Sequence, residues 1–209
     1  MTPLQQYRQV WLRADHLLSI HAYVSANATA AVNSDELLRA DWAARVSALD
    51  LFVHELVAQR MVQIFDGARP VCDGFNRFLL STETARRIAA ATSMADRSAA
   101  FDLAVRAQIE RATYQYPDDV AAAVRNFSTL ELWPSVALHL GATAATKASQ
   151  ASAIKLQLTQ IVRRRNKIVH EGDLQPSSPR TPWPISAGDV ASVRQFIDSL
   201  VAAIDAVTA

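Results

Sequence analysis

Residues 33–67, NSDELLRADWAARVSALDLFVHELVAQRMVQIFDG, carry a long periodic pattern. Large apolar side chains recur in it mostly three or four positions apart, at Leu38, Trp42, Val46, Leu49, Val53, Leu56 and Ile64. This spacing is typical of a helix that buries one face. Asn33 and Glu36 have the spacing of a capping box at its start, and Gly67 is expected to end it. The stretch predicts one long helix at the centre of a helical domain.

Signals for further helices lie on both sides of this stretch. Ser81, Asp96 and Ser186 are candidate side-chain caps, and Pro3 and Pro117 suit the first turn of a helix. The helix that begins at residue 117 is expected to break or kink near residues 133–134, where a proline occurs. The predicted helices cover, in chain order, residues 3–27, 33–66, 81–92, 96–114, 117 onward, 146–171 and 186–207.

Two segments are predicted to be irregular. Residues 66–80 are rich in turn formers, and Phe75 and Phe78 are expected to anchor this loop in the core. Residues 174–184 hold four prolines in eleven positions, which excludes a helix. We therefore expect residues 174–185 to form an extended connector before the last helix.

The composition fits one helical domain over residues 1–209. Half of the residues are apolar and only five are glycine, which suits helices and disfavours a β-rich fold. A chain of this length has ample apolar material for one core. The fold class we expect is all-α, a bundle with long antiparallel helices and short accessory helices.

The cysteine and histidine content argues against disulfides and metals. Cys72 is the single cysteine, so an intramolecular disulfide and a thiolate zinc site are excluded. The five histidines show no paired spacing with carboxylates, and no metal or other cofactor is expected. The N-terminal residues lack a signal-peptide pattern, and no apolar stretch approaches the length of a membrane span. These features predict a soluble, cytoplasmic protein without membrane contact.

The segment 162–173, VRRRNKIVHEGD, holds the residues with the clearest chemistry. Arg165 falls in the middle of an apolar stripe, a costly position unless an anion or another surface meets it. A salt bridge to a buried carboxylate would explain Arg165 equally well. Asn166 and His170 are four apart and share a face, whereas Arg165 and His170 diverge by ~140° around the helix. At ~100° per residue, this stripe is formed by Ile154, Leu158, Ile161, Ile168 and Val169.

Positive charge is concentrated in the same helix. Residues 146–170 contain six basic residues and no acid, although the net charge of the whole chain is only +1. Such a run favours a surface that faces a polyanion. A solvated helix face, with cations near its C-terminus, accounts for the run as well. The six residues are Lys147, Lys155, Arg163, Arg164, Arg165 and Lys167.

The element R-N-x-x-x-H at residues 165–170, followed by E-G-D at residues 171–173, resembles the signature of the HEPN superfamily. Upstream, the stretches at residues 48–57, 64–70 and 75–78 are similar to the RiboL-PSP-HEPN branch. The resemblance extends over most of the chain. It implies a helical fold and, as in many members, cleavage of RNA.

The chemistry implied by this resemblance is that of a metal-independent endoribonuclease. The RNA 2′-hydroxyl attacks the adjacent phosphate and leaves a 2′,3′-cyclic phosphate and a 5′-hydroxyl. Histidine is the side chain type whose ordinary titration range includes neutral pH, so His170 is the candidate general base or acid. Arg165 would grip the phosphate and stabilise its developing charge. Asn166 would orient the phosphate or His170, or else bind nearby backbone.

A second copy of the chain is expected to complete the site. One histidine cannot serve well as both base and acid on opposite sides of an in-line displacement. In the family, two protomers bring their motif helices together, which supplies a second His170 and gives Arg165 a surface to meet. A homodimer is therefore expected. The resemblance also suggests a toxin or phage-defence effector, controlled by an antitoxin or another regulatory partner.

Other residues near the motif are secondary candidates. Arg163, Arg164 and Lys167 are expected to bind RNA. Glu171 and Asp173 either orient Arg165 or end the helix.

Candidates outside the motif have alternative structural explanations. Asp50 and His54, four apart on the long helix, either tune His170 or form a local hydrogen bond. Arg60, on the apolar side of that helix, should have a buried carboxylate partner or lie at an interface. Trp42 and Trp133 are expected in the core. Trp183 either stacks on a base or pins the connector to the bundle.

Two other functions compete with the nuclease. One is a HEPN-like module that binds RNA or a nucleotide without cutting it, and the other is a purely structural dimerisation domain. The presence of Arg165, Asn166 and His170 together favours the enzyme, because binding alone needs the charge but not the imidazole.

Overall fold

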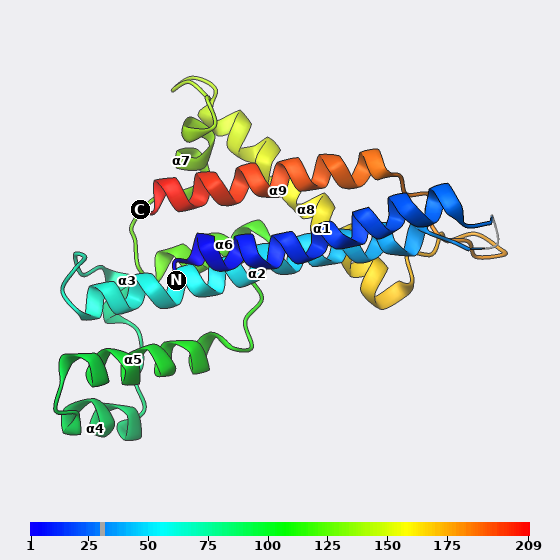
Figure 1. Ribbon diagram of the computed structural model, residues 1–209. Coiled ribbons are helices and arrows are strands. Elements are labelled where there is room, and N and C mark those ends of the chain that lie inside the picture. The colour runs from blue at the N-terminus through cyan, green and yellow to red at the C-terminus, as the bar shows by residue number, and fades with distance from the viewer. Residues whose placement is uncertain (30–31) are drawn as a thin grey trace.

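The computed structural model describes residues 1–29 and 32–209, and the fold over these residues is all-α, as predicted (Figure 1). The described residues form no strand and contain a single β-bridge, between Leu174 and Pro182. The helices are α1 (Pro3–Asn27), α2 (Asp35–Phe65), α3 (Asp73–Asn76), α4 (Thr82–Ala90), α5 (Met94–Ile109), α6 (Pro117–Arg125), α7 (Leu132–His139), α8 (Lys147–Glu171) and α9 (Ala187–Val207).

Helix α2 is the centre of the bundle. It packs against α1, α5, α6, α8 and α9. In Figure 1, α1 and α2 lie side by side and run in opposite directions, and α9 lies along them. All seven apolar residues predicted on the buried face of α2 are at most 7% exposed. The predicted central helix is therefore confirmed.

Two buried tryptophans tie helices to one another in this core. Trp42 and Trp133 are both buried, as predicted. The Trp42 indole donates a hydrogen bond to the carbonyl of Ile161 at 3.1 Å and so joins α2 to α8. The Trp133 indole donates to the carbonyl of Pro117 at 3.1 Å and joins α7 to α6. A buried indole N–H needs such a partner, which fixes the position of each helix.

The start of α2 differs from the prediction. Ser34 is the N-cap, and its side chain makes no capping hydrogen bond. Asn33 accepts the backbone N–H of Asp35 at 3.1 Å, and Glu36 accepts a hydrogen bond from Arg39 at 3.0 Å. The predicted capping box is therefore wrong, because Glu36 is engaged by a side chain within the helix.

Helix α5 also begins and ends elsewhere than predicted. Ser93 is its N-cap instead of Asp96, and the Ser93 hydroxyl accepts the N–H of Asp96 at 3.1 Å. The helix stops at Ile109. Five residues later, the N–H of Tyr114 donates to the Asp50 carboxylate at 2.6 Å and not to a helical carbonyl. A contact with α2 thus holds the chain in a non-helical path after α5.

The loop that follows α2 is anchored by aromatic rings, as predicted. The ring centroids of Phe75 and Phe78 each lie 5.8 Å from that of Phe101. Phe65 stacks on Phe101 at 4.4 Å with nearly parallel planes. Such pairs add to the free energy of burial, and here they join the end of α2 and the loop to α5.

Gly74 in α3 should not tolerate a side chain. A Cβ at this position would lie 1.8 Å from the carbonyl oxygen of Arg125, at the end of α6. We expect Gly74→Ala to lower the free energy of unfolding by about 1–3 kcal/mol, as overpacking usually does. Gly188→Ala is the matched control, because its Cβ would meet only the Ser186 hydroxyl, at 3.6 Å. Equal urea unfolding curves for the two variants would contradict the prediction.

A buried charged network joins α1 to α2, and the sequence patterns did not predict it. Arg45 is fully buried and donates to both carboxylate oxygens of Asp41, from 2.7 to 3.3 Å. It also donates to the carbonyl of Trp11 at 2.8 Å and to Asp15 at 2.7 Å. Its guanidinium lies 4.2 Å from the centroid of the Trp11 ring. Every nitrogen of this buried cation therefore has a partner.

Candidate functional site

Helix α8 carries the motif and is held from one side. Ile154, Leu158 and Ile161 of the predicted apolar stripe are buried, and Ile168 packs against the core while partly exposed. Val169, the last residue of this stripe, is 49% exposed. The packing that covers the first turns of α8 does not continue over this side of its last turn. In Figure 1 the end of α8, in orange, lies below the pair formed by α1 and α2.

Arg165 lies partly buried in a short hydrogen-bonded chain. It donates from Nη1 to Asn166 Oδ1 at 3.1 Å, and Asn166 donates from Nδ2 to the Tyr116 hydroxyl at 3.1 Å. The Nε of Arg165 is buried and has no hydrogen-bond partner within the described residues. Asn166 thus contacts a guanidinium and a phenol, and neither His170 nor backbone. It holds Arg165 in place, and Tyr116 fixes the amide in turn.

His170 lies in the last turn of α8 and is exposed. Its ring makes no side-chain hydrogen bond or ion pair to any residue that the structure describes. Because Arg165 and His170 diverge by ~140° around the helix, one chain by itself presents them on different faces. A ligand can reach the imidazole freely.

The three predicted RNA-binding cations have different environments. Arg163 and Lys167 are exposed. Arg164 is partly buried and donates to Asp173 at 3.1 Å and to the carbonyl of Pro184 at 2.7 Å. Its guanidinium also lies 5.1 Å from the centroid of Trp42. Arg164 therefore holds the connector to α8, whereas Arg163 and Lys167 face solvent.

Asp173 is a buried junction and does not contact Arg165. Its carboxylate accepts from Arg39 at 3.2 Å as well as from Arg164, and it is fully buried. Its carbonyl accepts the N–H of Trp183 at 2.7 Å. Arg39 also donates to the carbonyl of Trp183, at 2.7 Å. Asp173 thus joins the end of α8, the start of α2 and the connector.

The end of α8 follows the prediction. Gly172 has φ of +64° and is the C-cap, and Asp173 also has a positive φ of +54°. Left-handed backbone at these positions terminates a helix. Glu171 is exposed. This geometry agrees with the alternative in which residues 171–173 end the helix.

Asp50 and His54 contact the segment after α5 instead of α8. Asp50 accepts the N–H of Tyr114 at 2.6 Å and the Gln115 amide at 3.1 Å. The two ring nitrogens of His54 lie within hydrogen-bonding distance of backbone carbonyls. Nδ1 is 2.9 Å from the carbonyl oxygen of Asp50, and Nε2 is 3.2 Å from that of Ile109. These partners give both residues a structural role in the described chain, and none of them lies in the motif.

Arg60 lacks its predicted carboxylate. Its Nη1 donates to Gln63 at 2.9 Å, and no carboxylate of the described residues lies within ion-pair distance. Burial, with Arg69 nearby, lowers the pKa of Arg60 below its ordinary value. Of the two alternatives for Arg60, the buried carboxylate partner is therefore excluded, and the position at an interface stays a prediction.

A pocket of about 340 Å³ lies beside the motif. The ammonium of Lys167 lies 6.0 Å from the centroid of the Trp183 ring at this pocket, and Trp183 is 40% exposed. The pocket therefore combines exposed positive charge with an aromatic surface. It is lined by Gln160, Arg163, Arg164, Lys167, Asp173 and Trp183.

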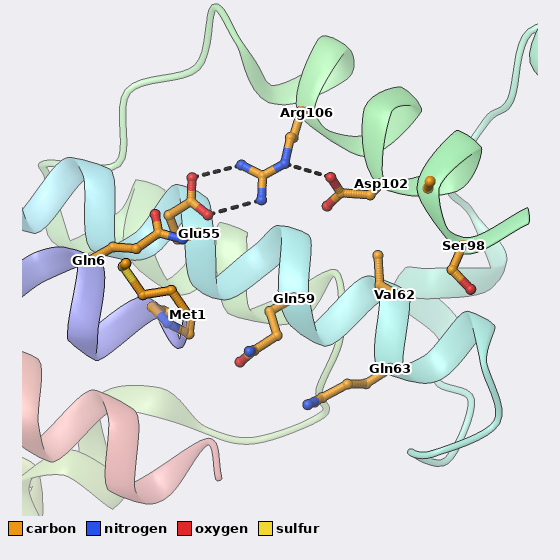
Figure 2. Close-up of a pocket in the computed structure, with 11 residues that line it drawn as sticks. Met1, Gln6, Glu55, Gln59, Val62, Gln63, Ser98, Asp102 and Arg106 are labelled. Carbon is orange, nitrogen blue, oxygen red and sulfur yellow. Dashed lines mark hydrogen bonds and ion pairs between the residues drawn. The ribbon is translucent and has the colours of Figure 1, made fainter. Parts of the chain in front are cut away.

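Another pocket, of about 330 Å³, lies between α1, α2 and α5 (Figure 2). Its charged side chains pair with one another. Arg106 donates to both oxygens of Glu55, at 2.7 and 2.9 Å, and to Asp102 at 2.8 Å. The charges of Arg106, Glu55 and Asp102 therefore compensate one another.

Glu55 provides a pH-dependent contribution to stability. The hydrogen bonds from Arg106 lower the pKa of the Glu55 carboxyl below its ordinary value of 4.5. A lowered pKa stabilises the fold above the unfolded-state value and loses that effect as pH falls through the folded-state value. Glu55→Gln should therefore cost about 1 kcal/mol at neutral pH, discounted because Arg106 is 42% exposed.

This cost should vanish well below pH 4.5, where both proteins carry a neutral side chain. Urea unfolding at the two pH values is the measurement. Glu83→Gln is a suitable control, because the Glu83 side chain is 82% exposed in its pair with Arg87. A cost for Glu55→Gln that is the same at both pH values would contradict the prediction.

The remaining comparisons concern metals, membranes and other proteins. In the described part of the chain, no three His, Cys, Asp or Glu side chains come together as a metal site. None of the helices described has the length and apolar character needed to span a membrane. Comparisons with protein-family models, curated proteins and solved structures gave no match.

Proposed function

We propose that the protein is a metal-independent endoribonuclease whose site is built on α8. The observation that carries the proposal is the environment of Arg165. Its guanidinium is held through Asn166 by Tyr116, and the Asn166 amide oxygen is the single acceptor that the described residues provide to it. A fixed cation with unused donor capacity is suited to a phosphate oxygen. The exposed His170 lies on the same helix and supplies an imidazole, the side chain that most often transfers protons in general acid–base catalysis.

In this reaction the RNA 2′-oxygen forms a bond to phosphorus as the bond from phosphorus to the 5′-oxygen breaks. A neutral His170 accepts the 2′-hydroxyl proton, and a protonated His170 gives a proton to the departing 5′-oxygen. Arg165 stabilises the extra negative charge on the phosphoryl oxygens. The products are a 2′,3′-cyclic phosphate and a 5′-hydroxyl.

The need for two imidazoles leads us to propose a homodimer with a shared cleft. Arg165 and Val169 lie ~40° apart on α8, and Val169 is 49% exposed there. This side of the last turn is where a second α8 would cover an apolar residue and meet a partly buried arginine. The His170 side chains of both copies would then reach one phosphate that Arg165 holds in the shared cleft.

A non-catalytic module that binds RNA or a nucleotide is the second candidate. It is favoured by the absence of a partner that orients the His170 ring within the described residues, because catalytic histidines are usually held by a second group. The basic pocket beside Trp183 would serve binding in either case. If the protein is a nuclease, we also propose that it acts as a toxin or defence effector and that a regulatory partner controls it.

The test is incubation of the purified protein with total RNA in excess chelator. We expect cleavage that persists in chelator and leaves 5′-hydroxyl ends, which a polynucleotide kinase labels without prior phosphatase treatment. Tight RNA binding without cleavage would favour the binding module instead. Cleavage that disappears in chelator would contradict the proposed chemistry.

A further inference from the structure

Trp183 differs from the other tryptophans of the chain. It is 40% exposed, whereas Trp11, Trp42 and Trp133 are each at most 7% exposed. Tryptophan is enriched at interfaces, because its side chain joins a large apolar ring system to a polar N–H. The alternative is that the side chain pins the connector to the bundle.

The connector is fixed by its backbone, independently of the indole. The N–H of Trp183 donates to the Asp173 carbonyl, and its carbonyl accepts from Arg39, both at 2.7 Å. The Gln175 N–H donates to the Thr181 carbonyl at 2.8 Å, which closes the connector on itself. Proline on both sides of Trp183 restricts the backbone further. The indole is thus displayed from a rigid support and is free to bind.

Positive charge surrounds the exposed ring. Arg163 and Lys167 are four residues apart on α8 and line the same pocket as Trp183. The Lys167 ammonium lies 6.0 Å from the ring centroid, the outer limit of a cation–π contact. Aromatic rings stack with centroids 4.5–7 Å apart, so a planar base on the indole would take the place of this ammonium. Lys167 would then be free to reach the phosphate of the same nucleotide.

We propose that this pocket binds one unpaired nucleotide of the RNA, with the base stacked on Trp183 and the phosphate between Arg163 and Lys167. This inference rests on the proposed function and adds a subsite and a preference to it. Residues 163, 167 and 170 are spaced by four and three, so they follow one face of α8. The strand would run from the pocket along this face to His170. A base in a duplex is already stacked on both sides, so the pocket selects single-stranded RNA.

The test uses the His170→Ala protein, so that RNA is bound without being cut. Affinity is measured by fluorescence anisotropy for a short labelled single strand and for the same strand in a duplex. In this background, Trp183→Leu should weaken single-strand binding roughly 10-fold, as expected for one stacked base. Trp183→Phe should retain most of the affinity. Arg163→Ala should weaken binding and reduce its salt dependence, while Arg13→Ala, which removes an exposed charge of α1, should not.

Intrinsic fluorescence gives an independent readout, since only Trp183 is exposed enough to stack on a base. RNA should quench tryptophan emission in the parent protein and not in the Trp183→Phe variant. Unchanged affinity of a folded Trp183→Leu variant, or quenching that survives Trp183→Phe, would overturn the inference. Binding through Trp183 by a protein that never cuts RNA would support the subsite and refute the nuclease. Cleavage with no effect of Trp183→Leu on binding would refute the subsite alone.

Discussion

Replacing His170 with alanine is expected to reduce the rate of RNA cleavage by about 10²–10⁴-fold, the usual contribution of a general acid or base. The rate at saturating RNA should decrease, because the imidazole moves protons only during bond formation and cleavage. RNA affinity should change little, since Arg163 and Lys167 keep their charges. The fold should also be unaffected, because His170 is exposed at the end of α8.

His139→Ala is the matched control for this prediction. His139 is also exposed and also lies in the last turn of a helix, α7. Single-turnover cleavage rates and RNA affinities of both variants are the measurement. If the two variants cut RNA equally well, the role assigned to His170 would be wrong.

Replacing Arg45 with alanine is expected to lower the free energy of unfolding by about 3–5 kcal/mol, the cost of breaking a buried ion pair from one side. Arg45 is fully buried and holds Asp41, Asp15 and the carbonyl of Trp11. Without it, the buried carboxylate of Asp41 loses the cation that is hydrogen-bonded to it. Arg87→Ala is the control, because Arg87 is 60% exposed in its pair with Glu83 and should cost less than about 1 kcal/mol.

The pH dependence of the Arg45→Ala variant provides a second test. Burial raises the pKa of Asp41 above its ordinary value of 3.8, against the opposing effect of Arg45. Without Arg45 the carboxyl should take up a proton more readily in the folded state. The destabilisation should then shrink as pH falls from neutral, because a neutral Asp41 needs no partner. Urea unfolding at several pH values measures this, and a cost that grows as pH falls would contradict it.

The sequence predicted the helices well where their signals are local. The apolar spacing along α2, the terminal glycine of α8, and Ser186 with Asp189 before α9 are all read within one or two turns, and all agree with the structure. The predicted caps Asn33 and Asp96 are replaced by Ser34 and Ser93, so at both sites two residues of the capping type lie within three positions of each other. A spacing rule does not decide between such neighbours.

The hydrogen-bond partners of the motif residues could not be predicted from such local signals. Tyr116 reaches Asn166 across 50 positions of sequence, and Arg39 reaches Asp173 across 134. No periodic pattern links residues so far apart. Arg164 has the same charge as Arg163 and Lys167, yet it holds the connector, because its position on α8 faces Asp173 and not solvent. The sequence thus identified the chemical groups, and only the fold assigned their partners.

Cleavage by mixed dimers tests the shared site most directly. Wild-type and His170→Ala subunits are combined in equal amounts and allowed to exchange, and the rate of RNA cleavage is compared with that of wild type alone. If each cleft needs His170 from both copies of a closed dimer, only dimers of two wild-type subunits cut, and about one quarter of the activity should remain. A rate of one half, with activity proportional to the wild-type fraction, would mean that one His170 suffices for each active site and would contradict the proposal.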